Sequence, residues 1–215
     1  MPTRQRGEPS GVGRELFPGR TRSILRVMDS LQKKPKRRNA PQTKARILAA
    51  AQRAFAEHGY AQAGIREIAA MAGISSPMLL RYFGSKTGLF EAALIETTRV
   101  ETLFEERRDR FGEHLVSLLL DATVDIQSPS ILALSTGHAD ARAIATRVTD
   151  DHVIEPLAKW LGPPDAHARA LEIVMLGMGF VTWTRLYPLM TARKGVDKKL
   201  AKWFAQTLQA IVDQS

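Results

Sequence analysis

The stretch that decides the fold is IREIAAMAGISSPMLLRYF, residues 65–83. Its first half has apolar residues at positions i, i+3, i+4 and i+7, the pattern of one buried helix face: Ile65, Ile68, Ala69 and Ala72. Gly73 follows, and glycine ends a helix readily because it adopts the left-handed backbone conformation without a side-chain penalty. The pattern therefore predicts a short helix that stops at Gly73, with Ile74 as an apolar plug at the turn.

A second short helix is expected directly after this turn. The hydroxyl of Ser75 or Ser76 can cap it, and Pro77 suits the first helical position, where no N–H is needed. Leu79 and Phe83 lie four residues apart and can face back toward the first helix. Two helices joined by a short turn with glycine form a helix-turn-helix, whose second helix enters the major groove. The alternative is an ordinary helical hairpin in an all-α core, and the flanks decide between the two.

The flanks extend the pattern well beyond the motif. Upstream lies TKARILAAAQRAFAEHGY (residues 43–60), and downstream lies GSKTGLFEAAL (residues 84–94). Residues 43–94 together resemble the DNA-binding domain of the tetracycline-repressor (TetR-type) family of bacterial regulators. The matching features are the opening Thr43, Ile-Leu-x-Ala-Ala, Phe-Ala-x-x-Gly-Tyr, Ile-Ala-x-x-Ala-Gly-Ile-Ser and Tyr-Phe-Gly-Ser-Lys. Agreement in this order over about fifty residues identifies the family far more specifically than a lone helix-turn-helix would.

The resemblance implies which side chains contact DNA. Arg66 can reach a phosphate or a base edge, and Arg81 can donate two hydrogen bonds to a guanine. Tyr82 and Lys86 match the family's phosphate contacts. The expected set comprises Thr43, Arg66, Ser75, Ser76, Pro77, Met78, Leu80, Arg81, Tyr82 and Lys86.

Two positions depart from the family pattern. Leu80 stands where the family usually has tyrosine, and it should face outward because Leu79 takes the inward direction. Gly64 stands where threonine or serine would cap the first helix of the pair. These departures make the preferred operator sequence less predictable, whereas the remaining matches still predict that DNA is bound.

Basic charge is concentrated at one end of the chain, whose 215 residues carry a formal net charge of +9. Residues 1–41 hold 11 Lys and Arg against 3 Asp and Glu, residues 42–90 hold 6 against 2, and residues 91–215 hold 14 against 17. The excess therefore lies in and before the helix-turn-helix, where a polyanion would bind. Residues 1–41 are rich in Pro, Gly and Arg, so we expect a disordered arm whose basic run, residues 33–38, neutralises phosphates or enters the minor groove.

Two alternatives stay open for this arm. The basic run can be a solvated tail that only aids solubility. MDSLQKKPKRRNAPQTK, which begins at Met28, would also be a sensible protein start, and residues 1–27 would then be absent from the native protein. The intact mass of the natively expressed protein distinguishes these starts.

The rest of the chain has helical periodicity and no strand-like alternation, so the expected fold class is all-α, with about nine helices. We expect a three-helix DNA-binding domain over residues 42–90, whose first helix covers 42–58. A helical ligand-binding and dimerisation domain should follow over residues 91–215. Ser85 caps a fourth helix that continues into the charged run at residues 105–110. In the family this helix is the lever that moves when a ligand binds.

The two closing helices, expected near residues 165–187 and 197–212, predict a homodimer. The first is apolar nearly all round and must be buried on every side, and the second has a continuous apolar stripe. Packing both helices of each subunit into a four-helix bundle buries these faces, and TetR-type regulators dimerise in this way. Gly177 and Gly179 would allow backbones to approach closely. The expected interface consists of Leu171, Val174, Met178, Leu200, Trp203, Phe204, Leu208 and Ile211.

The resemblance also implies a ligand pocket among the middle helices. Its candidate lining residues are Phe104, Leu115, Leu119, Thr123, Met175, Phe180, Trp183 and Tyr187. As a set they indicate a small apolar effector with few polar anchors. Met and aromatic stripes at helical spacing are more often core than pocket, so most of these side chains are expected in the core.

Enzyme and membrane functions find no support in the sequence. There is no cysteine, which excludes disulfides and thiol nucleophiles and fits a reducing cytoplasm. The five histidines never pair at i+3 or i+4, and no phosphate-binding loop or dinucleotide fingerprint occurs. Ser135, His138 and Asp140 lie too close in sequence for a catalytic triad. The longest apolar run, Ile173–Trp183, has eleven residues and is too short to span a membrane, and no secretory signal is visible. We therefore expect no catalysis, no cofactor and no metal.

The sequence thus predicts a cytoplasmic, homodimeric, ligand-responsive transcriptional regulator. It would be a repressor that a small apolar effector releases from a palindromic operator, with half-sites about 34 Å apart. One alternative is a ligand-independent architectural or division-type regulator of the same fold, which would have a filled core. The other is a DNA-processing enzyme such as a recombinase, which would need a catalytic Ser or Tyr with clustered Arg and carboxylates outside the motif.

Overall fold

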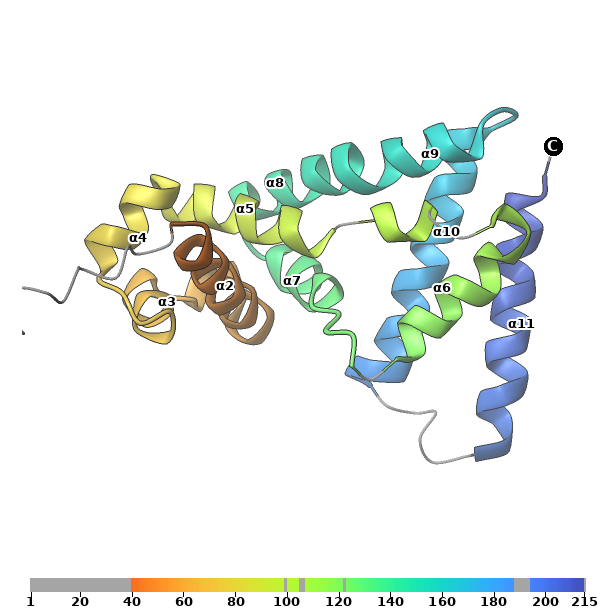
Figure 1. Cartoon of the computed structure of the whole chain (residues 1–215), viewed down its shortest axis with the longest axis horizontal. Coiled ribbons are helices and arrows are strands. Elements are labelled where there is room, and N and C mark those ends of the chain that lie inside the picture. Colours follow the sequence, from red (N-terminus) through yellow and green to blue (C-terminus); the bar gives the residue numbers. More distant parts are fainter. Residues whose placement is uncertain (1–39, 99, 105–106, 122, 188–193, 215) are drawn as a thin grey trace, which may run out of the picture. The chain divides into compact units, whose positions relative to one another are not determined.

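The computed structural model describes residues 40–98, 100–104, 107–121, 123–187 and 194–214. Every regular element in these ranges is helical, which confirms the predicted all-α fold class (Figure 1). The expected basic arm and the alternative start at Met28 lie outside the described residues. The α-helices are α2 (Ala40–Gln62), α3 (Ile65–Met71), α4 (Ser76–Phe83), α5 (Lys86–Thr97), α6 (Phe111–Leu120), α7 (Ser128–Ser135), α8 (Ala139–Thr149), α9 (Glu155–Leu161), α10 (Ala166–Val181) and α11 (Lys194–Val212).

Helix α2 buries a stripe that includes Ile47, Ala51 and Phe55, as its periodicity predicts. The helical geometry breaks at Gly59, where φ is 70°, and one further turn continues to Gln62. A Cβ at Gly59 would lie 3.1 Å from the Cβ of Leu134 on α7. Gly59 therefore both kinks α2 and lets α7 pack closely against the kink.

The prediction that the fourth helix continues into residues 105–110 is wrong. Helix α5 ends at Thr97, short 3₁₀ turns follow at Glu101–Phe104 and Arg108–Arg110, and a new helix begins at Phe111. Two consecutive threonines lie at the end of α5. The hydroxyl of Thr97 donates to Leu94 O at 2.8 Å, and that of Thr98 donates to Ile95 O at 3.1 Å. Such local side-chain bonds compete with the helical backbone pattern.

Two π-helical turns interrupt the later helices. Asp150–Ile154 joins α8 to α9, so that the two run on as one rod in Figure 1. Thr182–Leu186 extends the C-terminal end of α10. A π turn inserts one extra residue into a helix and thereby rotates the side chains that follow it.

The buried side chains form two hydrophobic clusters. The first contains the interior of α2–α5, and it continues into α7 through Ile131 and into α8 through Ile144 and Val148. The second is built from α6, α9, α10 and α11, with Phe111, Phe204 and other apolar residues at its centre. The helix-turn-helix thus shares its core with two helices that follow much later in the chain.

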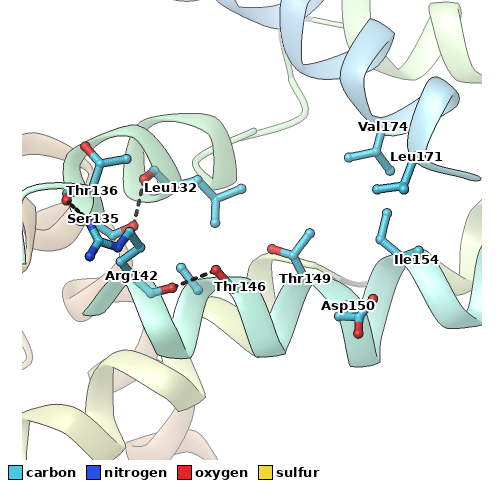
Figure 2. Close-up of a pocket in the computed structure, with 11 residues that line it drawn as sticks. Leu132, Ser135, Thr136, Arg142, Thr146, Thr149, Asp150, Ile154, Leu171 and Val174 are labelled. Atoms are coloured by element: carbon cyan, nitrogen blue, oxygen red, sulfur yellow. Dashed lines mark hydrogen bonds between the residues drawn. The ribbon is translucent and has the colours of Figure 1, made fainter. Parts of the chain in front are cut away.

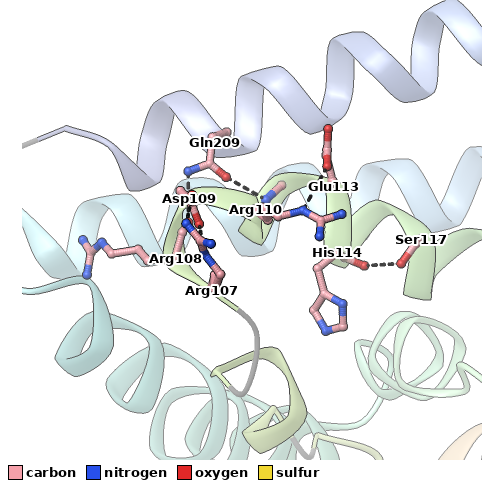
Figure 3. Close-up of polar contacts among 9 residues, drawn as sticks. Arg107, Arg108, Asp109, Arg110, Glu113, His114, Ser117 and Gln209 are labelled. Carbon is pink, nitrogen blue, oxygen red and sulfur yellow. Dashed lines mark hydrogen bonds and ion pairs between the residues drawn. The ribbon is translucent and has the colours of Figure 1, made fainter.

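Helices α6 and α11 approach each other very closely. A Cβ at Gly112 on α6 would lie 2.1 Å from Ala205 O on α11, so only glycine fits there. Gln209 of α11 accepts a hydrogen bond from Gly112 N and donates one to Arg108 O, both at 3.0 Å (Figure 3). This amide therefore fixes the start of α6 against α11.

Candidate nucleic-acid interface

The helix-turn-helix has the predicted turn. Helix α3 ends at Met71, and Gly73 adopts a left-handed backbone with φ of 65°. Gly73 N donates to Ala70 O and Ile74 N donates to Ala69 O, each at 3.0 Å. This pair of bonds is the Schellman motif, which satisfies the last carbonyls of a helix. The predicted serine cap on the next helix differs: Ser75 is the N-cap residue, but its side chain makes no capping hydrogen bond.

Helix α4 separates an inward from an outward face. Leu79 is fully buried against the first hydrophobic cluster, whereas Leu80 is 39% exposed. Ser75, Pro77 and Arg81 are exposed with it, so these four residues form one solvent-facing surface. We call this surface the reading face.

The other expected DNA contacts differ in accessibility. Arg66 is exposed at the start of α3. Ser76, Met78 and Tyr82 are half-buried, and Tyr82 packs against the first cluster. Thr43 is buried at the start of α2.

Lys86 is held at the base of the reading head, by which we mean α2–α4 and the start of α5. Its Nζ donates to Ala61 O at 3.1 Å and lies 4.9 Å from the centroid of the Tyr60 ring. The Tyr60 hydroxyl lies 3.0 Å from Thr87 Oγ1, which ties α2 to α5. Partial burial lowers the pKa of the Lys86 ammonium. The ammonium is therefore positioned by α2 rather than free in solvent.

The predicted cap of α5 is present, and it depends on a residue that the sequence analysis did not single out. Ser85 Oγ accepts a hydrogen bond from Gly88 N at 3.0 Å. A Cβ at Gly88 would lie 2.4 Å from Phe83 O, at the end of α4. Gly88 therefore allows the recognition helix to dock tightly on α5. The signal was present as a glycine in the first turn of a helix, where other residues are better helix formers.

The eight expected pocket residues do not gather in one place. Leu115 and Leu119 of α6 line a cavity, whereas Phe180 stacks on Phe204 with ring centroids 4.3 Å apart in the second cluster. Phe104 stacks on Trp160 at 5.6 Å. Four of the eight are exposed instead: Thr123, Met175, Trp183 and Tyr187.

The cavity beside Leu115 measures about 430 Å³ and reaches the DNA-binding part of the chain. Its wall includes Gln52 of α2 and Thr97 of α5, and the Gln52 amide donates to Ala93 O at 3.3 Å. Leucines of α6 form the apolar side, and the segment from Val124 to Gln127 closes the rim. Gln127 Oε1 is buried and has no hydrogen-bond partner within the described ranges. We call this space the α5–α6 cavity.

Arg185 holds the segment from the end of α6 to the start of this rim. From the π turn after α10, its guanidinium donates to Leu119 O, Asp121 O and Val124 O at 2.9, 2.6 and 2.6 Å. Hydrogen bonds from Thr123, aided by the nearby Arg185 charge, lower the pKa of the Asp121 carboxyl. The end of α10 is thus bonded to the wall of the α5–α6 cavity.

A second cavity of about 460 Å³ lies between α7, α8 and α10 (Figure 2). Arg142 and Thr146 lie on its α8 side, and Leu171 and Val174 close it from α10. Neither α2 nor α5 contributes to its wall. It is therefore less directly connected to the reading head than the α5–α6 cavity.

The expected dimer-interface residues divide into two groups. Phe204, Leu208 and Ile211 are buried inside the subunit, where α11 packs on α6 and α10. Leu171 and Trp203 are 40% and 52% exposed. Val174, Met178 and Leu200 are half-buried. A Cβ at either Gly177 or Gly179 would meet no atom of the described chain within 4 Å.

No helix in the described part of the chain combines the length and the apolar character that a membrane crossing requires.

Comparison with known proteins agrees with this architecture. The nucleoid occlusion factor SlmA of Pectobacterium carotovorum is 33% identical over 79 residues, which are 34% of this chain and only 39% of that relative. A regulator assigned to the TetR family from Rhodococcus sp. has a TM-score of 0.65 at 16% identity and covers 80% of this chain and 100% of its own. Salmonella enterica GusR has a TM-score of 0.57 at 20% identity, with coverage of 79% and 93%.

Two family profiles match the chain directly. The profile of bacterial regulatory proteins of the tetR family matches residues 47–93, which contain the helix-turn-helix. The profile of the tetracyclin repressor-like C-terminal domain matches residues 109–212, which contain α6–α11. The chain therefore belongs to the TetR family of DNA-binding transcriptional regulators.

Proposed function

We propose that this regulator is a homodimeric repressor that a small, largely apolar effector releases from a near-palindromic operator. The reading face of α4 carries the proposal, because the short helix presents Leu80 and Arg81 outward while Leu79 anchors it from behind. Each subunit places one such face in a major groove. The family-matched contacts Arg66, Tyr82 and Lys86 support the phosphate side of the interface.

Arg81→Ala should weaken operator binding by about 1–3 kcal/mol and relax selectivity at one base pair, because a forked guanidinium contact to guanine is lost. Leu80→Ala should alter selectivity through the lost apolar contact. An operator obtained by binding-site selection, followed by fluorescence anisotropy at fixed salt, measures both effects. Lys159→Ala, an exposed change on α9, is the matched control and should leave affinity unchanged. Unchanged affinity and selectivity in Leu80→Ala would show that the reading face is wrongly assigned.

The homodimer is supported by apolar side chains that the subunit leaves exposed on its closing helices. Leu171 and Met175 of α10 are 40% and 64% exposed, and Trp203 of α11 is 52% exposed. Leu171 and Met175 lie one turn apart on α10, and exposed apolar side chains on a helix face indicate an interaction surface. A symmetric contact between two copies would bury these residues and give the two reading heads that a palindromic site requires.

Met175→Asp should convert the dimer to a monomer, because a carboxylate would be buried without a partner in the contact. Analytical ultracentrifugation over a range of concentrations measures the change. Leu120→Asp serves as control, since Leu120 is 45% exposed on α6 and lies outside the proposed surface. A parent protein that sediments as a monomer at micromolar concentration, or an unchanged dimer in Met175→Asp, would contradict the assignment.

The α5–α6 cavity is the proposed effector site. Its leucine lining suits an apolar body, and the unpaired Gln127 Oε1 suits a ligand N–H or O–H donor. Occupancy of this space bears directly on Gln52 and Thr97, which belong to α2 and α5. A ligand that prefers the released arrangement by a few kcal/mol is enough to empty the operator.

Leu118 of α6 also lines the α5–α6 cavity. Leu118→Trp should abolish effector-induced operator release while leaving operator affinity intact, because the indole fills this cavity. Leu120→Trp places the same side chain on the exposed side of α6 and should respond like the parent protein. Release is followed by anisotropy with a panel of small apolar compounds. A Leu118→Trp variant that still releases DNA on addition of a compound active on the parent would exclude this cavity.

A ligand-independent regulator of the same fold is the second candidate function. The partial likeness to SlmA, named as a nucleoid occlusion factor, favours it. In that case no compound in the panel would change operator affinity, and Leu118→Trp would behave as the parent protein in every assay.

A further inference from the structure

The π turn between α8 and α9 places two acidic side chains on the same side of the rod. Glu155 N–H donates to Asp150 O, a bond that spans five residues instead of four. In a regular α-helix, residues five apart point in clearly different directions, because each residue adds about 100°. The extra residue of the π turn removes most of this offset. Such turns occur frequently at functional sites.

The neighbouring helix adds a histidine to this pair. The chain reverses between Gly162 and Asp165, two residues with positive φ, and α10 then begins with Ala166–His167. His167 Nδ1 lies 3.4 Å from Glu155 Oε1. One ligand atom from each of Asp150, Glu155 and His167 lies within 4.8 Å of the others. The three side chains are solvent-exposed, so an ion can reach them.

We propose that Asp150, Glu155 and His167 bind a divalent first-row transition metal of the zinc type. One imidazole nitrogen with two carboxylate oxygens is a mixed ligand set that such ions accept, whereas Mg²⁺ and Ca²⁺ take oxygen ligands. Three protein ligands leave the remaining positions to water. The two neighbouring carboxylates repel each other without a cation between them, and a divalent ion offsets this repulsion.

Sequence spacing could not reveal this site. No histidine of the chain has another at i+3 or i+4, and His167 is twelve and seventeen positions from its two partners. The π turn and the chain reversal bring the three together. The proposal goes beyond the regulatory function, since neither the operator nor the effector takes part in it.

The position of the site predicts the structural effect of a bound ion. It would fasten the start of α9 to the first turn of α10. One turn beyond His167 lies Leu171, which faces Ile154 across the rim of the second cavity (Figure 2). A metal ion would therefore hold the N-terminal half of α10, and with it Leu171 and Met175, in a fixed place on the α8–α9 rod.

The test is a titration of the tag-free, full-length protein with ZnCl₂ at near-neutral pH after removal of metal with a chelator. Isothermal titration calorimetry should show one ion per chain, and EDTA should reverse the accompanying rise in melting temperature. His167→Gln and Glu155→Gln should each weaken binding at least about tenfold. His152→Gln is the matched control, because this exposed histidine lies in the same π turn outside the cluster, and it should bind like the parent protein.

Circular dichroism establishes that each variant is folded, so a loss of binding reports the ligand itself. Absence of saturable zinc binding to the parent protein would overturn the proposal. So would unchanged binding in His167→Gln, or a loss confined to His152→Gln. None of these outcomes depends on operator binding, so the metal proposal and the repressor proposal are tested independently.

Discussion

Arg169→Ala should lower the free energy of unfolding by about 3–5 kcal/mol, because a buried guanidinium and its four hydrogen bonds are lost. Arg169 is 2% exposed on α10. Its guanidinium donates to Gly162 O, Pro164 O, Ile211 O and Val212 O at 3.0, 2.7, 3.0 and 3.2 Å. Gly162 is the C-cap of α9, Ile211 and Val212 end α11, and Pro164 lies in the loop before α10, so the helices themselves supply no donor for these carbonyls. Alanine would leave several of them buried without a partner.

Urea unfolding at several protein concentrations measures this loss, since the proposed dimer would make stability depend on concentration. Arg147→Ala is the control. Arg147 pairs with Glu91 at 3.0 Å, but its side chain is 51% exposed, so its removal should change stability by less than about 1 kcal/mol. Equal effects of the two substitutions would mean that the four carbonyl bonds of Arg169 contribute little.

Gly112→Ala should destabilise the protein by about 3 kcal/mol, although alanine is the better helix former by about 1 kcal/mol. The added Cβ would lie 2.1 Å from Ala205 O and 3.0 Å from Gln209 N. Both atoms belong to the α11 backbone and cannot rotate away. The two helices must therefore separate, and the Gln209 bonds to Gly112 N and Arg108 O lengthen with them.

Gly137→Ala provides the comparison, because a Cβ at that position meets no described atom within 4 Å. It should change the urea midpoint by less than the equivalent of about 0.5 kcal/mol. A Gly112→Ala protein as stable as the parent would show that α11 can shift without loss of packing.

The reading head was predictable from the sequence because its determinants are local. Gly73 and Ile74 end α3 by donating to carbonyls three and five residues before them, respectively, and Ser85 caps α5 through an amide three residues later. The apolar spacing that predicts Leu79 inside and Leu80 outside also needs only one helix. The family resemblance was specific for the same reason, since it rests on residues that perform these local tasks.

The other features could not be predicted from the sequence, because they depend on contacts between segments that lie far apart in the chain. Helical periodicity shows that Phe204 and Leu208 face something apolar, but it cannot say whether that is α6 of the same chain or a second subunit. The α5–α6 cavity draws its wall from α2, α5, α6 and the segment after α6, and no spacing rule joins these. The end of α5 also could not be predicted, because the apolar helical pattern continues past Thr97, where the helix stops.

The continuity of the first hydrophobic cluster limits how this protein can be divided. Ile131, Ala141 and Val148 cover the reading head from α7 and α8, and all three are almost fully buried. A fragment that ends after α5 would expose the surface these residues cover and would lose part of its stability with it. Chimeras that exchange reading heads between relatives should therefore carry α7 and all of α8 along, because Val148 lies in the last turn of α8. The operator-binding unit is thus discontinuous in sequence. The boundary between it and the rest of the protein lies within the α8–α9 rod.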